Sequence, residues 1–192
     1  MIVKLLNETG WLEAIQAMRL SRQSASDSYS TNGSVTIGEK DHALILSLLN
    51  ADDNESGDPH SVALRMVNFT FLIKAPLYWW KQMDRYCVGK TQASSSTMYN
   101  IMKRELTADD FCDNIDERII KIVNRYIRTN DFEDVIANLP CGYLQERIVQ
   151  FSLPTLRRIL LQRERHKLVE WINFGNETLE QISYPEFVFE VV

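Results

Sequence analysis

Residues 69–98 read FTFLIKAPLYWWKQMDRYCVGKTQASSSTM, and this stretch joins an apolar segment to an aromatic one and then to a cluster of hydroxyl side chains. The segment Val67–Ile73 is rich in β-branched and aromatic residues, with Phe69 and Phe71 at alternate positions. This period of two predicts a strand with one buried face. Pro76 then ends the strand or occupies the first turn of the helix that follows.

A helix is expected over residues 77–88, because Leu77 and Trp80 are spaced to stack on one helical face. Gly89 would end that helix. Gln82 and Arg85 are three positions apart, so on a helix they share a face. The guanidinium of an arginine is a rigid fork of donors that suits phosphate or carboxylate. The end of this helix is therefore a candidate anion site.

The segment Gly89–Thr97 contains one lysine and five hydroxyl side chains after its glycine. Hydroxyl groups and backbone N–H groups in a turn can cradle a phosphate, so this segment is a second candidate anion site. The alternative is a solvated Ser/Thr loop that follows a core helix, and composition alone favours that alternative.

Periodicity predicts further elements on both sides of this stretch. A strand is expected at residues 1–6, helices at 11–22, 39–50, 131–139 and 153–174, and a helix that starts near Asp116. Residues 143–153 fit either a strand or a helix, and the tail 184–192 fits a strand or a docked extension. Residues 23–40 and 51–60 are expected to be polar surface loops. Mixed strands and long helices predict an α+β fold, with one domain over residues 1–192.

A second basic cluster lies in the C-terminal third of this acidic chain. Its members are Arg147, Arg157, Arg158, Arg163 and Arg165. On a helix, Arg158 and Arg165 would lie near Gln162, and such a group could bind an anion. The alternative is a solvated helix face whose other side buries Leu156 and Ile159, and periodicity does not decide between the two.

Charge, cysteines and histidines exclude several classes of function. The net charge of −5 over 192 residues argues against a general binder of polymeric nucleic acid. Cys87, Cys112 and Cys141 are far apart, which is typical of free thiols in a reducing cytosol. The three histidines lack the spacing of metal ligands. No apolar run is long enough to cross a membrane, and the first residues do not resemble a secretory signal, so a cytoplasmic protein is expected.

Several segments, taken in order, resemble the flavin-dependent thymidylate synthases. AMRLS at 17–21 is similar to an early AARVS segment of that family, and PHS at 59–61 falls where the family has a Gly-His loop. FTFLIKAPLYWWKQ is similar to the family's FTFxIKAP…Q strand and helix. LPCGYLQER and LLQRERHKLVEW are similar to two late family segments, so the resemblance spans roughly residues 1 to 175.

The resemblance implies a fold, an activity and a set of ligands. The implied fold is that of the thymidylate synthase-complementing proteins, with a mixed sheet flanked by long helices. The implied reaction transfers a one-carbon unit to C5 of dUMP, with FAD as cofactor and with methylenetetrahydrofolate and NADPH as co-substrates. The family binds FAD at the subunit junctions of a homotetramer, so a homotetramer is expected.

The resemblance also implies roles for individual residues. Nucleotide-binding roles carry over to Gln82, Ser95, Arg147 and Arg163, of which Ser95 and Arg163 are the expected catalytic residues. In this scheme Arg163 polarises the uracil ring, which is electrostatic catalysis. Cofactor-binding roles carry over to Ser21, His60, Ser61, Arg85, Tyr86, Lys90 and Gln92.

The chain departs from the family in its central motif, which is Arg-His-Arg, two residues, Ser, x, Asn-Glu, x, Ser, x, Arg-Tyr. Tyr86 and Cys87 replace the His and the second Arg, Ala93 replaces the Glu, and Thr97 replaces the later Arg. Met66 stands where the Gly-His loop has its second His. Each lost charged hydrogen bond would cost roughly 1.5–3 kcal/mol unless it is replaced, and Lys90, in place of a serine, is one candidate replacement.

Three functions therefore remain open, and the least favoured is a structural oligomer without a ligand, because the retained Gln, Arg and Ser positions cluster in the central motif rather than in the core. The first is a divergent flavin-dependent enzyme, of a branch often seen in phages and some bacteria, that adds methyl or hydroxymethyl to a pyrimidine monophosphate. The second is a homologue that binds nucleotide or flavin without catalysis, and the lost charged positions favour it. A flavin absorbance band of the purified protein distinguishes the first two.

Overall fold

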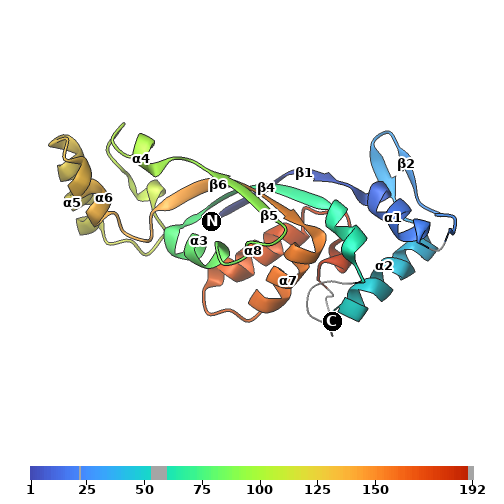
Figure 1. Ribbon diagram of the computed structural model, residues 1–192. Coiled ribbons are helices and arrows are strands. Elements are labelled where there is room, and N and C mark those ends of the chain that lie inside the picture. Colours follow the sequence, from blue (N-terminus) through green and yellow to red (C-terminus); the bar gives the residue numbers. More distant parts are fainter. Residues whose placement is uncertain (22, 53–59, 190–192) are drawn as a thin grey trace.

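The computed structural model describes residues 1–21, 23–52 and 60–189. Its centre is a four-stranded sheet in the order β1-β4-β6-β5, formed by β1 (Ile2–Thr9), β4 (Asn68–Pro76), β6 (Leu144–Ser152) and β5 (Lys90–Ser94). Helices gather below this sheet in Figure 1, and a separate helical lobe lies at one end. The α+β class and the family fold expected from the sequence are confirmed.

All pairings in this sheet are antiparallel, whereas a mixed sheet was expected. The pairing of Pro76 with Leu144 explains this difference. After β4 the chain forms α3 and the edge strand β5, and β6 then begins beside the ends of both strands, so it runs in the opposite direction to each. Residues 143–153, which fitted a strand or a helix, therefore form a central strand.

One face of the sheet is buried under helices. On β4, Phe69, Phe71 and Ile73 have no exposed surface, as the alternation in the sequence predicts. The helices around this core are α1 (Trp11–Leu20), α2 (Glu39–Asp52), α3 (Leu77–Met83), α7 (Leu153–Arg163) and α8 (Val169–Leu179), with the short helix η1 (Val62–Met66) beside α1. In Figure 1, α3, α7 and α8 lie on the same side of the strands.

The opposite face of the sheet carries a row of apolar residues. Leu72 pairs with Ile148, and Ile148 pairs with Ala93 on the edge strand. Ile148 is 47% exposed, in contrast to its buried neighbour Val149. This row, Leu72–Ile148–Ala93, is a candidate contact surface because it is apolar and faces outward.

Four sequence predictions need correction. The helix predicted over 77–88 ends at Met83, and residues 90–94 of the predicted hydroxyl loop form the edge strand β5. The helix predicted over 153–174 is two helices, α7 and α8, because the charged segment Arg163–Lys167 has no apolar side chain to bury. The loop predicted over 23–40 contains a hairpin of β2 (Tyr29–Thr31) and β3 (Ser34–Thr36).

The C-terminal tail was expected to form either a strand or a docked extension. The tail packs as a docked extension, with a short helix η3 (Pro185–Phe187) and with Phe187 and Val188 fully buried. Its last three residues lie outside the described residues, as do Arg22 and most of the predicted loop 51–60.

The lobe in Figure 1 has an apolar cluster of its own. It is formed by α4 (Thr97–Asn100), η2 (Ala108–Asp110), α5 (Glu117–Arg128) and α6 (Phe132–Asn138). Asn124 is buried there, and its amide donates to and accepts from the backbone of Leu106, with both distances at 2.8 Å. The lobe is therefore held by apolar burial and by the buried polar pair of Asn124 with Leu106, to which the exposed ion pairs Arg104–Asp110 and Arg128–Glu105 are added.

Two leucine substitutions test the position of the core. Leu156 in α7 has no exposed surface, whereas Leu20 at the end of α1 is 75% exposed. We expect Leu156→Ala to lower the free energy of unfolding by about 2–5 kcal/mol. Leu20→Ala removes the same atoms at the surface and should change it by less than about 0.5 kcal/mol. Equal effects in urea denaturation would contradict the packing described here.

Candidate functional site

The candidate site is built around the C-terminal end of α3. The backbone N–H of Asp84 makes the last helical bond, to the carbonyl of Trp80 at 2.8 Å, and the chain then turns, with the N–H of Tyr86 donating to the carbonyl of Met83 at 3.1 Å. Gly89 closes the turn with φ of +68°, and its carbonyl accepts from Ser152 at 2.9 Å. A Cβ at Gly89 would lie 2.3 Å from the hydroxyl oxygen of Thr155, so only glycine fits.

One group of predicted residues meets on the α8 side of this turn. The side-chain oxygen of Gln82 accepts from the indole N–H of Trp171 at 3.0 Å and from Arg163 at 3.4 Å. Arg163 also donates from Nε to the hydroxyl of Tyr86 at 2.8 Å, and its guanidinium lies 4.7 Å from the centre of the Trp171 ring. Gln82, Tyr86 and Trp171 therefore hold the Arg163 guanidinium in one orientation.

A second group lies on the sheet side of the same turn. Arg147 of β6 donates to the Asp84 carboxylate at 2.7 Å and to the side-chain oxygen of Gln145 at 3.0 Å. Its guanidinium lies over the ring of Trp80, 4.3 Å from the centroid. Lys90 donates to the carbonyl of Met83 at 2.9 Å. The cations of this group are thus fixed by α3 and by the strands next to it.

The charges of this second group shift the pKa values of its members. Burial raises the pKa of the Asp84 carboxyl, but hydrogen bonds from Gln92 and Arg147 outweigh burial, and the net shift is downward. Burial lowers the pKa of the Lys90 ammonium more than the attraction of Asp84 raises it. Asp84 therefore stays ionised well below neutral pH, and it balances the nearby cations.

Ser95 follows the edge strand and borders the same region. Its backbone N–H donates to the carbonyl of Glu146 at 2.9 Å. Ser95 and Arg147 both line a shallow cavity of about 270 Å³, together with residues of the outward-facing apolar row. Arg85 is exposed at the end of α3. The structure therefore gathers the predicted residues Gln82, Arg85, Tyr86, Lys90, Gln92, Arg147 and Arg163 near one end of α3, and Ser95 lies one position beyond the pairing of Ser94 with Arg147.

Three predicted cofactor residues lie elsewhere in the chain. The hydroxyl of Ser21 donates to the carbonyl of Met18 at the end of α1. The backbone N–H groups of His60 and Ser61 both donate to the carboxylate of Asp52 at 2.8 Å, and the Ser61 side chain is buried. These residues contact α1 and α2, so one copy of the chain does not bring them to the end of α3.

Two important residues of the site were not among the sequence predictions. Trp171 supplies the ring beneath Arg163, and Asp84 is the carboxylate to which the second group binds. A single aspartate after a helix has no diagnostic pattern in a sequence. The only available signal was its position two residues after Gln82, on the helix already assigned to the site.

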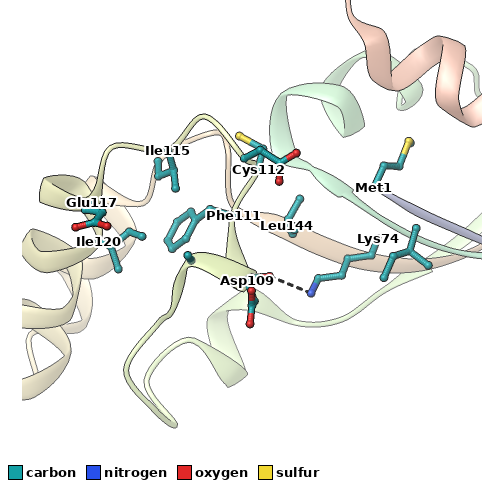
Figure 2. A pocket seen from close by; sticks show the side chains of 12 residues that line it. Met1, Lys74, Asp109, Phe111, Cys112, Ile115, Glu117, Ile120 and Leu144 are labelled. Atoms are coloured by element: carbon teal, nitrogen blue, oxygen red, sulfur yellow. Dashed lines mark hydrogen bonds between the residues drawn. The ribbon is translucent and has the colours of Figure 1, made fainter.

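A larger cavity of about 510 Å³ lies between the start of the sheet and the lobe. Figure 2 shows that Lys74 and Met1 lie on one side of it, and Phe111, Ile115 and Ile120 of the lobe on the other. The Lys74 ammonium donates to the carbonyl of Asp109 at 3.2 Å, which links the two sides. None of the predicted site residues lines this cavity.

Solved structures match this fold over nearly the whole chain. The flavin-dependent thymidylate synthase ThyX of Helicobacter pylori, solved with FAD and dUMP, matches with a TM-score of 0.76 and 18% identity, covering 99% of this chain and 98% of that chain. A second structure of the same enzyme with FAD and dUMP matches with a TM-score of 0.77 and the same identity and coverage. The chain has the fold of the flavin-dependent thymidylate synthases.

A third solved structure matches this chain over a smaller share of its length. The UMP/dUMP methylase PolB of Streptomyces cacaoi, bound to 5-Br dUMP, matches with a TM-score of 0.57 and 16% identity, covering 83% of this chain and 76% of that chain. No protein-family model and no curated protein sequence matches the chain. In the described residues, no helix is both long enough and apolar enough to span a bilayer.

Substitution of two glycines tests the turn that shapes the site. Gly89 and Gly33 both have positive φ, but a Cβ at Gly33 meets nothing within 4 Å. We expect Gly33→Ala to cost about 1–2 kcal/mol of backbone strain. Gly89→Ala should cost more, because it adds a clash with Thr155 and Ser152. Equal losses in urea denaturation would contradict the close approach at Gly89.

Proposed function

We propose that this protein transfers a one-carbon unit to C5 of a pyrimidine nucleoside monophosphate, with FAD as its redox cofactor. The observation that carries this proposal is the meeting of Gln82, Arg147 and Arg163 at the end of α3. These residues come from three separate segments of an acidic chain, in a fold whose solved examples bind FAD and dUMP. An anionic nucleotide is the ligand class that suits such a group.

Arg163 is suited to polarise the pyrimidine ring. Tyr86, Gln82 and Trp171 hold its guanidinium before any ligand arrives. A fixed cation beside a carbonyl oxygen of the base stabilises the negative charge that develops there when C5 reacts. Because the guanidinium is already oriented, little reorganisation is needed during the reaction.

Arg147 and Ser95 are suited to the phosphate and sugar. Both border the cavity of about 270 Å³ next to the end of β5, although the Arg147 guanidinium itself lies on the α3 face of the sheet, over Trp80. Arg147 rests on Trp80 and Gln145, so its donors point in a defined direction. The Ser95 hydroxyl, on an exposed residue, adds a neutral donor and acceptor.

The described residues fit a flavin only in part within one chain. Arg85 and Tyr86 lie at the end of α3, whereas Ser21 and His60 lie beside α1 and α2. We propose that a second copy completes the flavin site, in a homo-oligomer such as the expected homotetramer. The exposed Ile148 of the apolar row supports such an association. FAD would supply the redox chemistry, with NADPH and methylenetetrahydrofolate as co-substrates.

A second candidate function is nucleotide or flavin binding without catalysis. Two observations favour it. Tyr86, Cys87 and Ala93 replace charged or imidazole positions of the family motif. In addition, Arg147 is already neutralised by Asp84. Such a protein would sequester or sense its ligand.

The absorbance spectrum of the purified protein, with and without added FAD, tests the proposal. We expect a retained or reconstituted flavin band, together with dUMP binding in calorimetry. A colourless protein that cannot be reconstituted but still binds dUMP would support the binder and overturn the enzyme. A protein that binds neither FAD nor dUMP would overturn both functions.

Substitution of Arg163 tests its role within this site. We expect Arg163→Gln to weaken dUMP binding roughly 10- to 150-fold, the effect of losing about 1.5–3 kcal/mol of charged hydrogen bonding. Arg165→Gln is the matched control, because Arg165 is exposed just after the end of α7. Calorimetry measures both affinities, and thermal unfolding checks that both variants are folded. Equal affinities of the two folded variants would exclude Arg163 from the site.

A further inference from the structure

Asp84 is a carboxylate in the middle of a group of donors. Its Oδ1 accepts from Gln92 Nε2 at 2.8 Å and from Arg147 at 2.7 Å, and the Lys90 ammonium lies 3.6 Å away. Gln92 and Lys90 belong to β5, and Arg147 belongs to β6. One acidic side chain from the end of α3 thus binds donors from two strands.

These donors are held in place independently of Asp84. Arg147 is supported by Gln145 and by the ring of Trp80, and Lys90 by the carbonyl of Met83. The side chains of Arg147 and Lys90 are only 12% and 4% exposed, whereas that of Asp84 is 42% exposed. Among the three charged side chains, Asp84 is therefore the one that can turn toward solvent at the least cost.

A phosphate that approaches Arg147 meets this carboxylate. Two negative charges at hydrogen-bond distance from the same donor repel each other, and they do so more strongly near a protein surface than in water. The phosphate and the Asp84 carboxylate would also need the same N–H groups of Arg147 and Gln92. Both effects favour exchange of one anion for the other over simultaneous binding.

We propose that Asp84 is an internal competitor for the phosphate of the ligand. In the free protein its carboxylate occupies the donors of Arg147 and Gln92, and the phosphate binds by displacing it. Asp84 then sets how strongly the site discriminates a nucleotide from the corresponding nucleoside. This inference rests on the proposed function for the identity of the nucleotide, but the exchange itself concerns any phosphate.

The test compares the wild-type protein with Asp84→Asn in calorimetry, using inorganic phosphate, dUMP and deoxyuridine. Asparagine keeps the size of the side chain and removes its charge. We expect Asp84→Asn to tighten binding of phosphate and dUMP roughly tenfold, which corresponds to about 1.4 kcal/mol. Binding of deoxyuridine, which has no phosphate, should change by less than about twofold.

Two further variants separate competition from other effects. Glu133→Gln, at an exposed position of the lobe, changes the net charge equally and should leave phosphate binding unaltered. Asp84→Glu keeps the competing charge and should not tighten binding. If Glu133→Gln also tightened phosphate binding, net charge alone would explain the result for Asp84→Asn. That outcome would overturn the proposal.

The remaining outcomes separate this inference from the proposed function. Unchanged or weaker phosphate binding in Asp84→Asn would overturn the exchange, because Asp84 would then serve to position Arg147. Tighter phosphate binding in a protein that binds no dUMP would support the exchange and overturn the nucleotide function. Thermal unfolding of each variant confirms that the fold is intact.

Discussion

The packing of two consecutive tryptophans fixes the position of everything in the candidate site. Trp79 lies against Trp171 and Phe174 of α8, with ring centroids 4.7 and 5.4 Å apart. Trp80 donates from its indole N–H to the carbonyl of Gln145 at 2.9 Å and lies beneath the guanidinium of Arg147. One short helix is therefore anchored to α8 through Trp79 and to β6 through Trp80. The polar residues that follow the tryptophans have their positions set by this anchoring.

The end of α3 concentrates cations in a chain that is acidic overall. Arg163 is oriented by neutral partners and an aromatic ring, so its full charge is available to a ligand. Arg147 is paired with a carboxylate and is available only in part. Two arginines with similar surroundings in the sequence thus differ in the charge that they can offer to a ligand, because the groups around them differ in charge.

The sequence predicted those parts of the fold whose pattern is local. The strand at Val67–Ile73 was correct because its aromatic residues alternate, and the helix near Asp116 was correct because that residue caps it. The hairpin at residues 29–36 was missed, although Asn32-Gly33 is a strong signal for a tight turn. The helix over 153–174 was predicted too long because charged residues are compatible with helical propensity.

The site was predictable only in part, for a different reason. Gln82, Arg147 and Arg163 were chosen from the family resemblance, and the structure brings them to one place. Asp84 was not found, because its importance depends on donors from β5 and β6, which are remote in sequence. The separation of Ser21, His60 and Ser61 from α3 was also not visible, since it depends on how α1 and α2 pack. Contacts between remote segments are a property of tertiary structure and leave no periodic pattern.

The lobe has a topological consequence, because β5 and β6 are antiparallel neighbours and Ser94 pairs with Arg147. All of α4, α5 and α6 lies between these two positions, so the lobe is the connection of a single hairpin. The entropy cost of closing such a connection grows only slowly with its length. Insertions or deletions inside it therefore leave the strand register unchanged, and the lobe is the part of this fold most free to vary in size.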